Sequence, residues 1–230
     1  IMKLAYYTDS LPHMALEAVL KKITQQGVYH IELATGGWSP APHLNLNELL
    51  SNDTARADLQ SLLAKYAVKI VALNCSGNPL DPRETGKQHR EVTLNTFKLA
   101  KLLDVKTIVM MSGLPPASPN DETPNWITTT VSWPPELKVA LDYQWYEVAI
   151  PYWKQLVPIA KQYGIEKIAL ENHGTQLVYN PETLFKLRQA VDPMIGMNLD
   201  PSHLFWMGGD PIQCARKLEG AIHHMHGKDL

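Results

Sequence analysis

The 230-residue sequence contains only two cysteines, Cys75 and Cys214, and no run of about 18 apolar residues. Two cysteines are too few for a small secreted fold held by disulfides, and a membrane helix needs the longer apolar run that is missing. The first residues also lack the apolar segment and small-residue cleavage site of a signal peptide. We therefore expect a protein of the reducing cytoplasm with no membrane partner.

An excess of positive charge is missing as well. Lys and Arg number 21 against 23 Asp and Glu, which gives a formal net charge of -2, and no basic cluster stands out. Such a surface has no general attraction for nucleic acid, which we exclude as a partner. With 45% hydrophobic and 19% charged residues, the chain has an ordinary globular composition, and we expect a single domain over residues 1–230.

Short apolar segments alternate with segments of helical period. We predict seven strands, at residues 3–8, 30–35, 69–76, 107–112, 167–172, 195–200 and 222–227. Helices are predicted between them, at 16–27, 54–66, 89–103 and 181–191. Asn180 and Asp210 each precede a proline, which is typical of a capping residue at a helix start. This regular alternation indicates parallel strands with right-handed crossovers.

Two α/β folds share that alternation, the closed barrel and the doubly wound sheet. The glycine-rich phosphate loop of the doubly wound sheet is missing, because the sequence after the first strand reads YYTDSLPH. Several later strands end in residues with acid, base or ligand chemistry, and a barrel gathers its carboxyl strand ends around one axis. We predict a (β/α)₈ TIM barrel.

One segment, residues 113–138 after the fourth strand, interrupts the alternation. It is rich in Pro, Thr and Ser, carries Trp126 and Trp133, and is too long for an ordinary βα loop. Because it follows a strand, it is expected at the end of the barrel where the active site would lie. It is either an insertion or subunit contact without a catalytic role, or a lid or wall for a substrate.

Three consecutive late strands end in Glu171, Asp200 and His226. Side chains alternate along a strand, so all three face the barrel axis if the apolar Leu170 and Leu199 face the helices. Two ionised carboxylates at one place are costly unless a cation compensates them. Each residue alone has an ordinary explanation, such as a salt bridge or a turn cap. Their coincidence predicts a site for one divalent ion, with Mn²⁺, Co²⁺, Zn²⁺ and Mg²⁺ all compatible with mixed oxygen and nitrogen ligands.

Three further residues are candidates for contact with a substrate. His173 and His203 lie just after strand ends, where they could hydrogen-bond substrate hydroxyls or support a metal ligand. Lys228 shares a strand face with His226 and could contact a substrate oxygen or phosphate, or form a salt bridge. Glu32 on the second strand could also point inward, as half of all strand residues do.

The runs IALENHGTQLVYNPETLFKLRQAV, IGMNLDPSHLFWMGGDP and IHHMHGKD resemble the xylose isomerase-like barrel proteins called sugar phosphate isomerases/epimerases. That superfamily includes ketose 3-epimerases, hydroxypyruvate isomerases, inosose dehydratases and the endonuclease IV branch. The resemblance covers nearly the whole chain and implies a metal held by Glu171, Asp200 and His226. It also implies that His203 touches substrate hydroxyls.

The resemblance further implies a fourth ligand, a Glu on an eighth strand, and no such residue is present before Leu230. A seven-stranded barrel would expose two unpaired strand edges. We therefore expect the sequence to be part of a longer protein whose eighth strand is missing here.

The resulting hypothesis is a metal-dependent isomerase or epimerase of a small sugar or sugar phosphate. Glu171 or the Glu expected on the eighth strand would remove a proton to give an enediolate, and the other would return it on the opposite face or to the adjacent carbon. A dehydratase would expel a hydroxyl from the same enediolate and is the first alternative. A phosphodiester-cleaving enzyme would need more ligands and a basic face, and a non-catalytic sugar-binding barrel would have no reason to retain all three ligands. The sequence leaves open the sugar, its phosphorylation, the native metal and whether the chain forms a homo-oligomer.

Overall fold

A parallel sheet of seven strands forms the centre of the computed structural model, which describes residues 2–128 and 134–228. The strand order follows the chain, and every neighbouring pair is parallel. The strands are β1 (Tyr6–Tyr7), β2 (His30–Ala34), β3 (Lys69–Asn74), β4 (Thr107–Met110), β5 (Lys167–Glu171), β6 (Ile195–Leu199) and β7 (Ile222–Met225).

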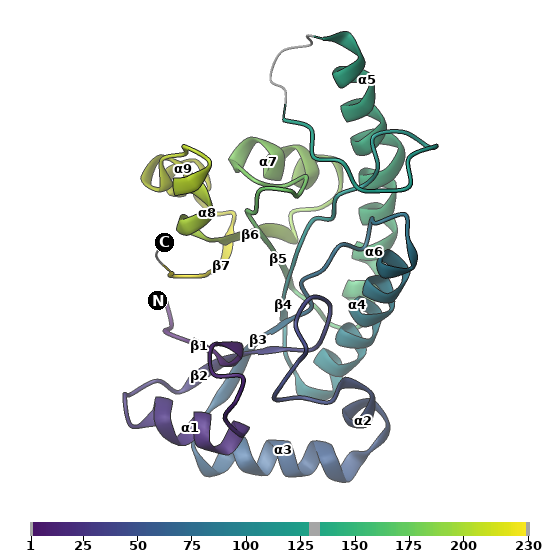
Figure 1. Ribbon diagram of the computed structural model, residues 1–230. Helices are drawn as coiled ribbons and strands as arrows, with labels where there is room; N and C mark the ends of the chain where they lie inside the picture. Colours follow the sequence, from purple (N-terminus) through teal and green to yellow (C-terminus); the bar gives the residue numbers. More distant parts are fainter. Residues whose placement is uncertain (1, 129–133, 229–230) are drawn as a thin grey trace.

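The sheet curls into an open half-barrel, with β1 and β7 on the two sides of the opening (Figure 1). Parallel strands curled in this way, with a helix following most strands, are the architecture of a TIM barrel, so the predicted fold class is confirmed. Within the described residues, no strand pairs with both β1 and β7.

Helices cover the outside of the half-barrel (Figure 1). They are α1 (Leu16–Thr24), α2 (Leu46–Ser51), α3 (Asp53–Lys65), α4 (Glu84–Leu103), α5 (Pro135–Asp142), α6 (Ile150–Gln162), α7 (Pro181–Ala190), α8 (Pro201–Trp206) and α9 (Pro211–Lys217). A 3-10 turn η1 (Thr8–Ser10) follows β1, and a π-helical segment η2 (Tyr143–Ala149) joins α5 to α6. None of the helices in the described ranges combines the length and apolarity needed to cross a membrane.

Helix boundaries follow local sequence signals closely. Asn180 caps α7, where its side chain accepts from the backbone of Thr183 at 2.9 Å and the hydroxyl of Thr183 accepts in return. Asp210 caps α9 by accepting from the backbone N of Ile212 and of Gln213 at 2.8 and 3.2 Å. Gly27 has a φ of 79° just after α1, a conformation that glycine adopts without strain. The prediction was wrong for the start of α4, which begins at Glu84 rather than residue 89, because its first turn lacks an apolar stripe.

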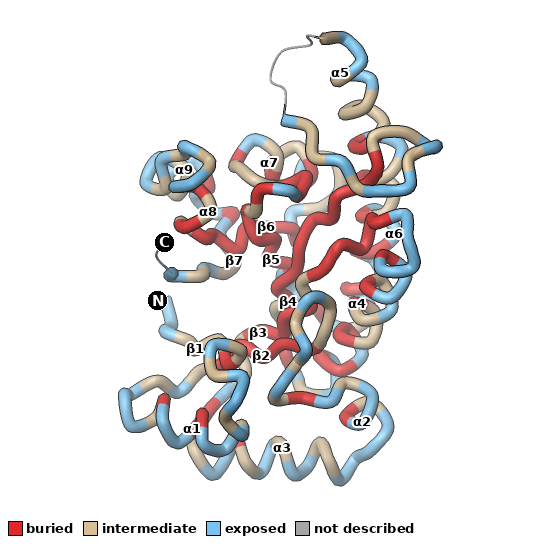
Figure 2. Tube along the Cα trace, viewed as in Figure 1, coloured by how far each residue is buried: buried red, intermediate tan, exposed pale blue. Residues whose placement is uncertain are grey.

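The two faces of the sheet differ in the size of their side chains. The outer face packs against the helices in one large core, and buried residues follow the strands and the inward faces of the helices (Figure 2). Leu170 and Leu199 belong to this core, as the alternation predicts. The inner face carries a separate small cluster of Ala72, Val109 and Ala169. Small inner residues leave room for longer polar side chains at the strand ends.

Two bulges change which residues face inward. In β3 the pairing passes from Ile70 to Ala72, so Val71 is an extra residue and is only half-buried. Val71 therefore does not join the large core on the outer face of the sheet. In β7 the pairing with β6 passes from Ile222 to His224, which leaves His223 as the extra residue and sets His224 opposite Asn198.

The expected insertion at 113–138 is shorter than predicted, because α5 already begins at Pro135, a favoured first helical residue. Trp133 lies outside the described residues. The preceding part packs against neighbouring elements: Gln144 donates to the backbone oxygens of Pro115 and Asn125 at 2.9 and 2.6 Å. Trp126 contacts Tyr179 edge to face, with 5.6 Å between ring centroids. Tyr179 lies between β5 and α7, so the segment does lie at the carboxyl ends of the strands.

Candidate metal centre

Glu171, Asp200 and His226 meet at the carboxyl ends of β5, β6 and β7. One potential ligand atom from each lies within 4.8 Å of the others. Glu171 and Asp200 are 6% and 0% exposed. His226 Nδ1 lies 3.3 Å from Glu171 Oε2. The structure therefore brings the three predicted ligands together, and their binding of a metal stays a prediction.

Asp200 is held in place by the first turn of α8 and by Asn172 after β5. Its Oδ1 accepts from the backbone N and the hydroxyl of Ser202 at 2.9 and 2.6 Å. The side-chain amide of Asn172 makes two hydrogen bonds to the backbone of Asp200. Its Oδ1 accepts from Asp200 N at 2.7 Å, and its Nδ2 donates to Asp200 O at 2.9 Å. These contacts fix the carboxylate and leave Oδ2 facing Glu171 and His203.

The buried Oδ2 of Asp200 has no hydrogen-bond partner among the described residues. Nζ of Lys228 lies 2.7 Å away, but the contact is an ion pair without hydrogen-bond geometry. A buried carboxylate oxygen that lacks a hydrogen bond and lies beside a second carboxylate is stabilised by a cation. The donor set of two carboxylates and one imidazole therefore fits a divalent ion.

Lys228 already brings one positive charge to this place. Its Nζ lies 3.8 Å from Glu171 Oε1 and 3.4 Å from His203 Nε2, besides its contact with Asp200. The sequence offers Lys228 as a substrate contact or a salt-bridge partner, and in this structure it is the salt-bridge partner of Asp200. The ammonium of Lys228 supplies positive charge to the same two carboxylates that would bind a divalent ion.

His203 connects the two carboxylates from α8. Its Nε2 lies 2.9 Å from Glu171 Oε1 and 3.3 Å from Asp200 Oδ2. Its Nδ1 accepts from Trp206 Nε1 at 3.1 Å, so Nε2 carries the proton and donates to Glu171. Burial alone would raise the pKa of Glu171, but hydrogen bonds from His203 and His226 outweigh it and hold that pKa below its ordinary value.

His173 lies behind His203 rather than against the carboxylates. The two rings are 4.1 Å apart between centroids, and His173 Nδ1 hydrogen-bonds the backbone oxygen of Gly174. Burial lowers the pKa of His173, so its ring is neutral near pH 7. The structure therefore places His173 as a support for His203, and its predicted contact with substrate stays a prediction.

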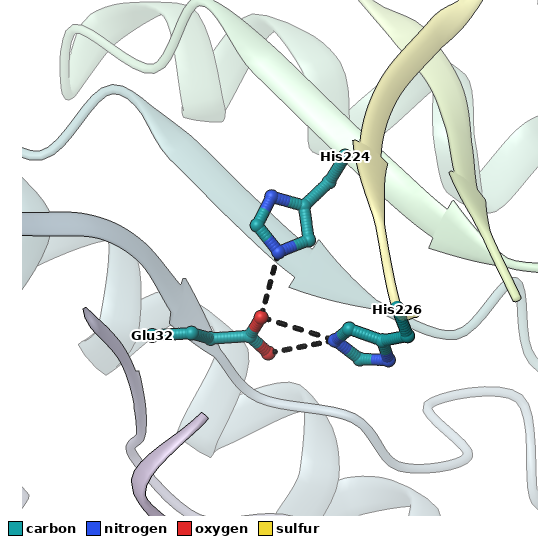
Figure 3. Close-up of side chains that lie close together, drawn as sticks. All are labelled: Glu32, His224 and His226. Atoms are coloured by element: carbon teal, nitrogen blue, oxygen red, sulfur yellow. Dashed lines mark hydrogen bonds and ion pairs between the residues drawn. The ribbon is translucent and has the colours of Figure 1, made fainter. Parts of the chain in front are cut away.

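Sequence reasoning missed the part played by Glu32 and His224. Glu32 reaches from β2 across the interior to β7, where its Oε2 lies 2.7 Å from His224 Nε2 and 3.0 Å from His226 Nε2 (Figure 3). These three residues form a second group with ligand atoms within 4.8 Å of one another. His224 and His226 are two positions apart and share a strand face, but no local spacing links either residue to a strand about 190 positions earlier.

The charges of this second group stabilise one another. Burial would raise the pKa of Glu32, but hydrogen bonds from His224 and His226 outweigh it and lower the pKa to about 2. Burial would likewise lower the pKa of His226, yet its contacts with Glu171 and Glu32 raise that pKa to about 10. Without a metal, His226 is therefore an imidazolium between two carboxylates.

Aromatic side chains surround the centre. Tyr7 of β1 stacks on His226, with 5.8 Å between ring centroids and 13° between ring planes. On the other side, Trp206 separates His203 from a cavity of about 810 Å³ that Trp126 and Tyr179 also line. The described part of the 113–138 segment thus forms a wall of a cavity beside the centre.

A family model described as "Xylose isomerase-like TIM barrel" matches residues 20–230 of the chain. The uncharacterized protein YfiH of Bacillus subtilis strain 168 is 60% identical over 229 residues, which is 100% of this chain and 73% of YfiH. Both comparisons extend over the strands that carry Glu32, Glu171, Asp200 and His226.

Solved structures of the same fold include a D-tagatose 3-epimerase-like protein, with a TM-score of 0.66 and 22% identity over 99% of this chain and 76% of the other. The IolI protein with a bound zinc atom has a TM-score of 0.66 and 22% identity, covering 98% and 72%. The probable 3-DHS dehydratase AsbF of Bacillus anthracis has a TM-score of 0.67 and 17% identity, covering 98% and 72%. At these identities the likeness shows the fold.

Proposed function

The chain belongs to the xylose isomerase-like TIM barrel family, and from this premise we propose that it is a divalent-metal-dependent isomerase or epimerase of a small sugar or sugar phosphate. One observation carries the proposal. Glu171, Asp200 and His226 converge at the carboxyl ends of three neighbouring strands, and the buried Oδ2 of Asp200 lacks a hydrogen bond among the described residues. The epimerase-like and IolI structures of the same fold support it.

The oxygens of Glu171 and Asp200 and Nδ1 of His226 would hold the ion. Mn²⁺, Co²⁺, Zn²⁺ and Mg²⁺ all suit this donor set, and the zinc atom of IolI shows that the fold can hold such an ion. When bound, a divalent ion supplies Lewis-acid polarisation of a carbonyl oxygen.

Glu171 is the proposed acid and base. Its carboxylate removes the proton from the carbon beside the substrate carbonyl, and the C–H electron pair moves toward the carbonyl to give an enediolate. Return of a proton by Glu171 to the neighbouring carbon on the same face completes an isomerisation. An epimerisation needs a second acid that returns a proton to the opposite face of the same carbon. The N–H of His203 fixes Glu171 Oε1 at 2.9 Å, so the carboxylate keeps one orientation during the transfer.

Contacts to the substrate would come from His203 and Lys228, with His173 behind them. Lys228 is 52% exposed, so its ammonium can turn from Asp200 toward a ligand oxygen, whereas His203 would have to release its N–H from Glu171 to donate to a sugar hydroxyl. Both cysteines are free, with Cys75 buried, which supports a reducing cytoplasm as the place of action. A small sugar is the proposed partner of this site, and an assembly of several copies stays a prediction.

A dehydratase is the second candidate, because the probable 3-DHS dehydratase AsbF shares the fold over 98% of this chain. The same Glu171 would form the enediolate, and a hydroxyl on the next carbon would then leave with the displaced electron pair. Product analysis separates the two reactions, because only the dehydratase releases water and an unsaturated product.

The experiment measures metal content after dialysis for the wild type, Asp200→Ala and Asp81→Asn. Asp81 is a matched buried carboxylate that pairs with Arg83 at 2.6 Å and lies outside the centre. We expect about one metal per chain in the wild type and Asp81→Asn and none in Asp200→Ala. Ketoses are then incubated with the loaded protein in D₂O, and deuterium at the carbon beside the carbonyl is read by NMR.

Absence of metal from the wild type would overturn the proposal and favour a sugar-binding barrel without catalysis. Metal without deuterium uptake by any ketose, and without water release, would overturn the proton-transfer reaction while leaving the metal site intact.

A further inference from the structure

The two ring nitrogens of His226 face different residues. Nε2 points to the carboxylate of Glu32, at 3.2 and 3.0 Å from its two oxygens, and Nδ1 points away from it (Figure 3). Nδ1 lies 3.3 Å from Glu171 Oε2 and 3.1 Å from Asn198 Nδ2. The nitrogen that faces the candidate metal ligands is therefore Nδ1.

Glu32 is itself held in one orientation. Asn74 on the neighbouring β3 donates from Nδ2 to Glu32 Oε1 at 2.7 Å. The other end of this amide, Oδ1, accepts from the backbone N of Ser76 at 2.8 Å, which fixes which way the amide points. His224 donates to Glu32 Oε2 at 2.7 Å. Glu32 is 2% exposed, so water does not compete with these contacts.

An ionised carboxylate only accepts hydrogen bonds, so Glu32 requires a proton on Nε2 of His226. A metal ligand must be the neutral ring, and with its proton kept on Nε2 the neutral imidazole has its lone pair on Nδ1. We propose that Glu32 is a positioning residue that fixes the ring of His226 with Nδ1 toward the metal. The inference rests on the proposed function, because it concerns the same metal.

Glu32, His224 and His226 could instead hold a second ion, since their ligand atoms also lie within 4.8 Å of one another. The contacts favour the positioning role. Both oxygens of Glu32 already accept hydrogen bonds, from Asn74 and from His224, whereas Oδ2 of Asp200 accepts none from the described residues. A cation would gain most where a buried oxygen has no donor.

Glu32→Gln tests the role with a side chain of the same size. Asn74 would still donate to the oxygen of the introduced glutamine, so its NH₂ group would face His226 and could not accept from Nε2. The ring would then turn or move its proton to Nδ1, which removes the ligand lone pair. Titration with Co²⁺ alone should show about 10- to 100-fold weaker binding than in the wild type. The ligand-field spectrum of Co²⁺ should change as well, which a loss of stability alone would not cause.

Asp81→Asn is the control and should keep wild-type Co²⁺ affinity, because Asp81 contacts Arg83 and lies outside the centre. A measurement on the wild type does not depend on whether the variant folds. In the Zn²⁺-loaded wild type, ¹⁵N NMR of labelled histidine should show His226 bound through Nδ1 with a proton on Nε2.

Binding through Nε2, or two Co²⁺ per wild-type chain with one lost in His224→Gln, would overturn the positioning role. Unchanged Co²⁺ affinity in a folded Glu32→Gln would overturn it too while leaving the proposed function standing. No Co²⁺ binding by the wild type would overturn the proposed function itself, so the two failures are distinguishable.

Discussion

At the scale of single residues, the two central carboxylates differ in what neutralises them. Both oxygens of Glu171 lie against imidazole nitrogens, from His203 and His226. Oδ2 of Asp200 lies closest to the ammonium of Lys228, at 2.7 Å, although Asp200 itself is completely buried. Asp200 is therefore the carboxylate whose negative charge a bound divalent ion would stabilise most.

This dependence predicts the effect of Lys228→Met. The change removes an ammonium that a divalent ion must displace, so Co²⁺ binding should become tighter. Lys228 is 52% exposed, so the ion pair contributes at most about 1 kcal/mol, which corresponds to roughly fivefold in affinity. Isothermal titration of the wild type and the variant with Co²⁺ measures the difference.

Lys138→Met is the matched control, because Lys138 forms an ion pair with Asp142 on the exposed face of α5. Its Co²⁺ affinity should equal that of the wild type. Weaker binding in Lys228→Met would show that the ammonium supports the metal site instead of competing with the ion.

At the scale of elements, the close contact of β6 with β7 sets the position of His226. Gly196 lies in β6, and a Cβ there would lie 2.6 Å from the backbone oxygen of Ala221 and 2.3 Å from the ring of His223. Both distances are shorter than Cβ contacts allow, so only glycine permits β7 to approach this closely.

Gly196→Ala should therefore push β7 outward. We expect a loss of about 1–3 kcal/mol in the free energy of unfolding, together with weaker Co²⁺ binding, because His226 moves with β7. Urea denaturation and metal titration measure the two effects. Gly209→Ala serves as the comparison, since its Cβ would meet Leu204 at an ordinary 3.4 Å. Equal stability of both variants would contradict the tight strand contact.

The bulged residue of β7 predicts a pH dependence. Burial, followed by the positive charges of Arg188 on α7 and Lys167 on β5, lowers the pKa of His223. The pKa of this histidine is lower in the folded state than its unfolded value of about 6.5, so the folded state binds fewer protons. Its contribution to stability is therefore present above pH 6.5 and is lost as the pH falls.

The free energy of unfolding of the wild type should thus fall more than that of His223→Gln between about pH 8 and pH 5. Urea denaturation with a chelator present measures both proteins, and the difference between them isolates His223 from the other histidines. Parallel pH curves for the two proteins would show that His223 titrates normally in the folded protein.

At the scale of the whole molecule, the candidate centre connects parts of the sheet that are far apart in sequence. Glu171, Asp200 and His226 come from β5, β6 and β7, and Glu32 joins them to β2 across the interior. Figure 1 shows that β1 and β2 lie opposite β7 at the open side of the half-barrel. An ion bound here would link the two sides through side chains.

Metal binding should therefore raise the stability of the whole fold. An ion that binds only the folded state adds about 2.7 kcal/mol when its concentration is roughly 100 times Kd. Thermal unfolding with and without Co²⁺ should show this gain in the wild type and Asp81→Asn but not in Asp200→Ala. An equal gain in Asp200→Ala would place the ion outside the candidate centre.

Much of the fold follows from the sequence, because its signals are local. The period of apolar residues located all seven strands, and the pairs Asn180-Pro181 and Asp210-Pro211 located two helix starts. Errors occurred where local signals are weak. The first turn of α4 has no apolar stripe, and the bulge at Val71 depends on the register with β2 rather than on β3 itself.

The sequence by itself determined the alternation of strands and helices and the three inward residues at the ends of β5, β6 and β7. Alternation along one strand and neighbouring positions in one sheet are enough to predict both. Only the tertiary structure decided that Glu32 reaches His226, that Asp200 Oδ2 faces Lys228, and that a bulge sets His224 opposite Asn198. These contacts depend on the curl of the sheet and the register between strands, which bring together residues that no local spacing relates.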